Sequence, residues 1–214
     1  MGLHWEPLMT ALPGHEAEFE DLFAKLVTTR GARRDQLTGW LEKVGEPPFK
    51  TIGAPRVGYD AAANEWLRAR LEKSDRLGEL EQMKIDMHGY TVLELMPPSE
   101  GFPVYSNHIN SDALDRYAFH VQLLLDTDVL DPSMRARAQT LMLPAEHAAF
   151  AADLLAVAKK YAADHALQET VATIREPVFP EGSKDRAGHI AFSAAKWSVY
   201  WSGRGYGLAL TTDS

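Results

Sequence analysis

The sequence contains no cysteine, no excess of basic residues and no long hydrophobic run. The absence of cysteine excludes disulfide bonds, thiol catalysis and thiolate metal ligands. The 22 lysines and arginines are outnumbered by 30 aspartates and glutamates, giving a net charge of −8. Nucleic-acid binding depends on clustered positive charge, so this balance argues against nucleic acid as a partner. It argues equally against binding to an anionic membrane surface.

No apolar stretch approaches the roughly 20 residues that a bilayer-spanning helix needs. The first residues lack a basic segment followed by an apolar run, so no secretion signal is predicted. We therefore expect a cytoplasmic protein. Hydrophobic residues (45 %) and charged residues (24 %) occur in the proportions of an ordinary globular protein. We expect one domain over residues 1–214, with sub-layers at 1–96 and 104–214.

Apolar residues spaced by three and four positions predict helices along most of the chain. The first third carries one such stripe at 19–26, another at 37–44 and a third after Asp60, a favoured N-cap residue. Further stripes indicate helices over 114–125 and after each of two prolines, Pro132 and Pro144. The helical residues thus dominate the predicted structure.

Two segments alternate with the period of a strand instead. Residues 85–95 alternate after the first helices, which predicts one strand there. Near the C-terminus, residues 197–201 alternate, glycine-rich residues 202–205 follow, and residues 206–210 alternate again, which predicts a β-hairpin. The predicted fold class is α+β: a predominantly helical layer packed on a small antiparallel sheet that includes this C-terminal hairpin.

None of the strong catalytic motifs is present. The sequence has no phosphate-binding loop, no serine nucleophile elbow and no zinc-binding helix. The best constellation is His108, Asp112 and His120, because imidazole and carboxylate groups bind divalent metals and transfer protons. These three are the predicted catalytic residues. Helix capping by Asp112 and an ordinary loop hydrogen bond from His108 explain the same pattern.

A second set of residues suggests a ligand-binding surface. On the predicted strand at 85–95, His88 and Tyr90 share one face. In the predicted hairpin, Trp201, Arg204 and Tyr206 concentrate aromatic and polar groups of the kind enriched at interfaces. A solvated strand face and core packing are the structural alternatives. We predict these five residues as ligand-binding.

The leading functional prediction is a binding or protein-interaction protein. Its predicted partner is either a second copy of the same chain, in a homodimer, or another protein. The alternative is a hydrolase-like enzyme that uses the His/Asp constellation, with a divalent metal as a candidate cofactor. A third reading is an inhibitory partner of another protein, with which a net charge of −8 is compatible. The sequence specifies neither the reaction nor the ligand.

Overall fold

A three-stranded antiparallel sheet joins the two ends of the chain. In the computed structural model its order is β6-β1-β7, formed by Phe119–His120, Leu3–Leu8 and Gly207–Thr212. Strand β1 pairs with β7 along its whole length, from Leu3 opposite Thr212 to Leu8 opposite Gly207. The structure describes residues 2–29, 31–46, 55–95, 113–114, 119–172 and 179–212.

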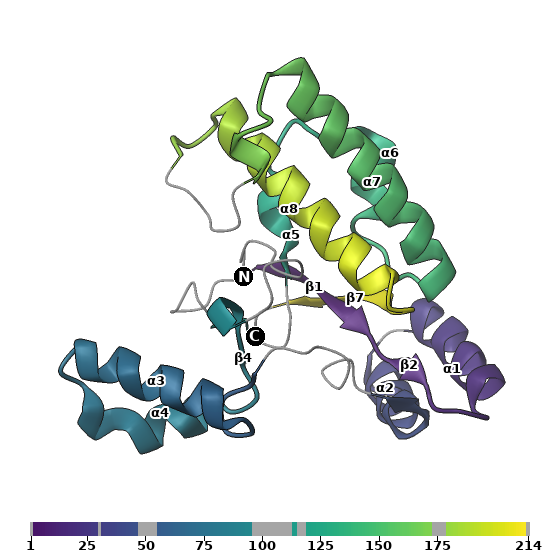
Figure 1. Cartoon of the computed structure of the whole chain (residues 1–214). Helices are drawn as coiled ribbons and strands as arrows, with labels where there is room; N and C mark the ends of the chain where they lie inside the picture. Colours follow the sequence, from purple (N-terminus) through teal and green to yellow (C-terminus); the bar gives the residue numbers. More distant parts are fainter. Residues whose placement is uncertain are drawn as a thin grey trace.

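The main core lies between this sheet and two long helices, α7 (Pro144–Asp164) and α8 (Lys184–Ser202), which lie side by side (Figure 1). Trp5 of β1 is fully buried there, with its ring centroid 5.7 Å from those of Phe150 and Trp197. Alanines along both helices allow close approach and favour helix. Large aromatic rings from three elements thus fix the sheet against the helices.

Two short helices, α5 (Val121–Leu125) and α6 (Pro132–Arg137), complete this part, followed after α7 by the 3-10 turn η4 (Thr170–Ala172). The predicted start of α6 is confirmed, because the Asp131 carboxylate accepts a 2.7 Å hydrogen bond from the Met134 N–H.

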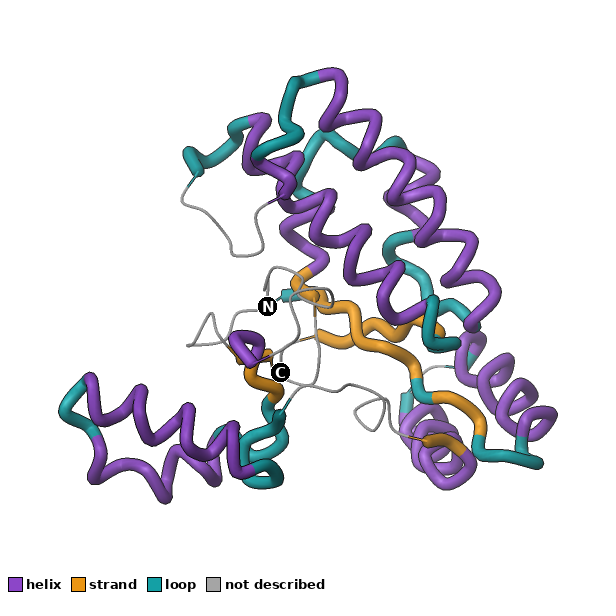
Figure 2. Tube along the Cα trace, viewed as in Figure 1, coloured by secondary structure: helices purple, strands orange, loops and turns teal. Residues whose placement is uncertain are grey.

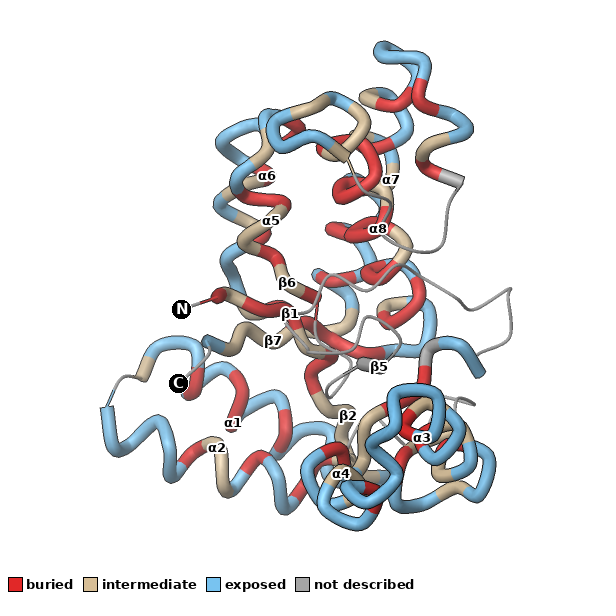
Figure 3. The backbone as a smooth tube through the Cα atoms, turned by 90° about the vertical axis from the view of Figure 1, so that its left-hand side faces the viewer, coloured by how far each residue is buried: buried red, intermediate tan, exposed pale blue. Residues whose placement is uncertain are grey.

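A second cluster forms around α1 (Glu16–Thr28) and α2 (Ala32–Val44), beside a small sheet of β2 (Thr10–Ala11) and β3 (Gly45–Glu46). The predicted apolar stripe of α1 is confirmed, since all four of its residues are buried in this cluster. Leu8 of β1 and Ala209 of β7 also pack into it. Figure 3 shows α1 and α2 next to each other, with buried stretches on both helices.

A third cluster belongs to a helical pair that Figure 1 shows set apart from α7 and α8. Its elements, with the short strands beside it, are α3 (Ala61–Lys73), η2 (Leu77–Glu79), α4 (Leu80–Asp86), β4 (Thr91–Val92), η3 (Leu93–Leu95) and β5 (Ala113–Leu114). The predicted Asp60 N-cap position of α3 is confirmed. The predicted α+β class is confirmed as well, with few strand residues among many helical ones (Figure 2).

The predicted C-terminal hairpin is wrong. Trp197 and Trp201 lie in α8, and only the second half of the predicted hairpin is a strand, β7, which pairs with β1. Residues spaced by four fit both a strand and a helix, so the two tryptophans did not distinguish them. Upstream alanines, among them Ala194 and Ala195, extend the helix instead.

The predicted strand over 85–95 is wrong too. Helix α4 continues to Asp86, and Gly89 has a φ of 85°, a left-handed conformation that interrupts any strand. Only Thr91 and Val92 are extended and paired. The predicted helix over 114–125 is shorter than expected, because α5 begins at Val121 directly after β6.

Candidate functional site

Among the described residues, the outer side of β7 is paired only at Leu208. Strand β7 lies at one side of the three-stranded sheet, with β1 as its inner neighbour. On its outer side, Leu208 exchanges two backbone hydrogen bonds of 2.9 Å with Met142, one donated by each N–H. The N–H and C=O of Leu208 therefore point away from β1, toward the outer edge.

The direction of the next backbone groups follows from this pair. Backbone groups alternate sides along a strand, so the N–H and C=O of Leu210 and Thr212 also point outward. No described residue donates to or accepts from them there. The pairing of Met142 with Leu208 is an isolated bridge, and no strand of the described ranges continues it beside Leu210 and Thr212.

A cavity of about 450 Å³ lies at this edge; we call it the edge groove. It is lined by Leu3, Val27, Arg34, Gln139, Thr140, Leu141, Leu210 and Thr212. The strand edge forms one wall, residues 139–141 form a second, and the α1–α2 pair contributes Val27 and Arg34. The groove therefore combines outward-pointing strand-edge groups, which have no partner among the described residues, with apolar and polar side chains.

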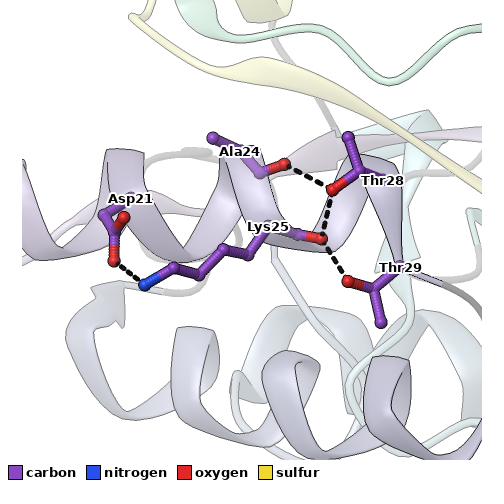
Figure 4. A network of polar contacts seen from close by, with 5 residues as sticks. All are labelled: Asp21, Ala24, Lys25, Thr28 and Thr29. Atoms are coloured by element: carbon purple, nitrogen blue, oxygen red, sulfur yellow. Dashed lines mark hydrogen bonds and ion pairs between the residues drawn. The ribbon is translucent and has the colours of Figure 1, made fainter.

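The end of α1 that carries Val27 is held in place by its own side chains (Figure 4). The Thr29 hydroxyl donates a 2.6 Å hydrogen bond to the Lys25 carbonyl, and the Thr28 hydroxyl donates to the same carbonyl at 3.1 Å. Lys25 pairs with Asp21 one turn earlier. These bonds satisfy carbonyls of the last turn, which otherwise lack partners. Val27 lies in this stabilised last turn of α1, with 48 % of its surface exposed.

A second cavity, of about 420 Å³, lies between the end of α5 and the start of α8. Two of its charged lining residues, Asp128 and Lys184, bond to each other. Asp128 also accepts a 3.1 Å hydrogen bond from the Tyr161 hydroxyl. These contacts fasten the α5–α6 turn to α7 and α8, which gives the three residues a structural role.

The pKa values in this second cavity agree with that role. The hydrogen bond from Lys184 holds the pKa of Asp128 below its ordinary value, and the same bond raises the pKa of Lys184. Burial is the main cause that raises the pKa of Tyr161, and its hydrogen bond to the Asp128 carboxylate raises this pKa further. These directions favour a charged Asp128, a charged Lys184 and a neutral Tyr161 at neutral pH.

The predicted catalytic residues are only partly placed. His108 and Asp112 lie outside the described residues. His120 lies in β6 and stacks on His4 of β1, with ring centroids 4.8 Å apart and planes at 17°. Within the described ranges, no group of three or more metal-ligating side chains could hold a metal ion.

The predicted ligand-binding residues do not form one site. His88 is exposed beside Tyr59, with ring centroids 4.7 Å apart, and Tyr90 packs against the α3–α4 cluster. Trp201 and Tyr206 are buried in the main core. Arg204 is exposed and stacks over the ring of Tyr200 at 3.6 Å. These two aromatic residues thus pack in the core, and a ligand-binding role for the five residues stays a prediction.

Sequence reasoning missed the residues of the edge groove. The alternation of residues 206–210 predicted a strand, but it did not indicate which side of that strand lacks a partner. Arg34 lies in the first turn of α2, and no local pattern of the sequence indicates that it lines a groove. The bridge between Met142 and Leu208 would have shown which side of β7 is outermost. It joins residues 66 positions apart, so no short stretch of the sequence predicts it.

No family model, curated protein or solved structure matches this chain. None of the helices in the described part of the chain is both long and apolar enough to span a membrane. The functional argument therefore rests on the geometry and chemistry of the edge groove.

Proposed function

We propose that this chain is a protein-interaction protein that binds an extended segment of a partner protein in the edge groove, by adding it as a strand beside β7. The observation that carries the proposal is that Leu210, whose N–H and C=O point away from β1 and have no partner among the described residues, lines this cavity. Added strands obtain affinity from such main-chain hydrogen bonds and specificity from side-chain pockets.

The protein itself supplies a precedent for this pairing. Met142 already forms the antiparallel pair at Leu208, with both bonds at 2.9 Å. A partner residue opposite Leu210 would repeat that pair one step along the strand. The next such position is opposite Thr212, about 7 Å further on. The groove has room for the short segment that would make both pairs.

Hydrogen exchange tests the free edge directly. In the protein alone, the amide of Leu210 should exchange faster than those of Ala209 and Thr211, which face β1. The probe is a set of peptides selected on the full-length chain from a displayed library of random ten-residue sequences. We expect selected peptides to slow exchange at Leu210 and to leave the two neighbouring amides unchanged.

Two variants locate the binding site. Leu210→Pro removes the outward N–H, and proline is tolerated at sheet edges. Thr140→Trp fills the groove with a bulky side chain. Each should weaken binding of labelled peptides at least tenfold in anisotropy titrations. Ser133→Trp adds the same bulk on an exposed residue of α6 outside the groove and should leave affinity unchanged.

Three results would overturn the proposal. One is selected peptides that leave Leu210 exchange unaltered. Another is peptide binding that tolerates Thr140→Trp. The third is concentration-dependent dimerisation that protects Leu210, because the occupant would then be a second copy of this chain. Light scattering across micromolar concentrations distinguishes that case.

The hydrolase-like alternative, with His108, Asp112 and His120, stays a prediction, as does the cytoplasmic location. Two of its three residues lie outside the described ranges, and the described one stacks on another histidine. Elemental analysis of untagged protein tests the metal-dependent form. A stoichiometric transition metal that is lost in His108→Ala would support it.

A further inference from the structure

The edge groove contains one charged side chain among its described lining residues, Arg34. This residue is exposed, and no described carboxylate pairs with its guanidinium group. Some other surface cations have such partners, for example Lys25 with Asp21 and Arg76 with Glu79. Within the described part of the chain, Arg34 is thus a cation without a carboxylate partner, on a protein with a net charge of −8.

The position of Arg34 in its helix is not explained by helix stability. It lies in the first turn of α2, where the positive end of the helix dipole disfavours a cation. Asp35 in the same turn offsets this effect for the helix, but it does not line the groove. Within the groove, the field of Arg34 therefore favours a negative charge.

The register of β7 indicates which residue of an added strand would approach Arg34. Leu210 lies opposite Trp5, so it and any residue paired with it face the main core. Ala209 faces the opposite side and packs into the α1–α2 cluster. An added residue opposite Thr211 would share the face of Ala209. That face is the one beside the helices that carry Val27 and Arg34.

We infer that the segment bound in the edge groove carries an aspartate or glutamate at the position opposite Thr211, paired with Arg34. This inference rests on the proposed function and adds the chemistry of the partner to it. Arginine suits a carboxylate because its planar guanidinium donates two parallel hydrogen bonds. The alkyl part of the acidic side chain would pack beside Val27.

The experiment compares peptide pools selected from the same displayed library on three proteins. The wild-type chain should enrich acidic residues at one position. The Arg34→Ala variant should lose this enrichment, and Arg34→Glu should replace it with lysine or arginine. Arg33→Ala is the matched control, because Arg33 is an exposed neighbour that does not line the groove. It should preserve the wild-type preference.

Affinity measurements complete the test. Replacing the enriched Glu by Gln in a selected peptide should weaken binding about three- to tenfold at low salt, as expected for an exposed to half-buried ion pair. The difference should shrink at 0.5 M salt and vanish in Arg34→Ala. Peptides that protect Leu210 but show no acidic preference would overturn this inference and leave strand addition intact. Peptides that fail to protect Leu210 would overturn both.

Discussion

Replacing Trp5 by phenylalanine tests the most connected residue of the core. Trp5 is fully buried in β1, between β6 and β7, and its indole N–H donates a 2.8 Å hydrogen bond to the carbonyl of Ala138 at the end of α6. Its ring also contacts Phe119, with centroids 5.4 Å apart. The substitution keeps an aromatic ring in the strand but removes the donor and part of the volume.

Two contributions set the expected magnitude. Removing the indole donor from a buried carbonyl costs about 1–3 kcal/mol, because that carbonyl is already out of water. The smaller ring leaves a void whose lost packing costs about 1 kcal/mol more. We therefore expect Trp5→Phe to lower the free energy of unfolding by about 2–4 kcal/mol.

Urea unfolding followed by far-ultraviolet circular dichroism measures this change without depending on tryptophan fluorescence. Trp40→Phe is the matched control, because Trp40 lies on α2 with 44 % of its surface exposed. It should alter the free energy of unfolding by less than about 0.5 kcal/mol. If both variants unfold at the same urea concentration as the wild type, the assignment of Trp5 to the centre of the core is refuted.

Three further predictions concern other parts of the fold. Burial lowers the pKa of His147, whose Nδ1 lies 2.8 Å from the Tyr206 carbonyl oxygen, so the unfolded chain takes up the proton first as pH falls. The free energy of unfolding should therefore decrease as the pH falls below about 6.5, by at most about 1.4 kcal/mol per pH unit. Urea titrations at a series of pH values measure this decrease, and His147→Asn should remove the part that His147 contributes. Asp131→Ala removes the N-cap of α6 and should cost about 1 kcal/mol in chemical denaturation, whereas an unchanged midpoint would refute the capping role. Gly207→Ala would place a methyl group 2.3 Å from the Met142 carbonyl oxygen and should lower the melting temperature. Gly39→Ala is the control, because this glycine lies in open space on α2, and it should raise the melting temperature. A melting temperature that changes in the same direction in both variants would contradict the packing at Gly207.

Local sequence patterns predicted the amphipathic helices well. In α1, four apolar residues at helical spacing coincide with the buried stripe, and in α6 the Asp131–Pro132 pair marks the start. These features depend on interactions within one or two turns, which a short stretch of sequence records. The α+β class followed from their number.

The strands were harder to predict because their partners are distant. Strand β1 contains Pro7, a residue that argues against a strand within a sheet. On the β7 side the structure accommodates it, because Pro7 lies opposite Leu208, whose N–H and C=O bond to Met142 instead of β1, so no hydrogen bond to β7 is lost. The edge groove could not be predicted either, because it is lined by residues 139–141 and by β7, which are far apart in the sequence.

The pairing of β1 with β7 also has a consequence for the order in which the protein matures. The first strand cannot obtain its longest partner until Gly207–Thr212 has been synthesised and has left the ribosome. At roughly 5–20 residues per second, β1 therefore waits on the order of ten seconds or more while the intervening helices emerge. During that interval its unpaired backbone is exposed to other chains, so chaperone dependence during translation should be concentrated on this N-terminal segment.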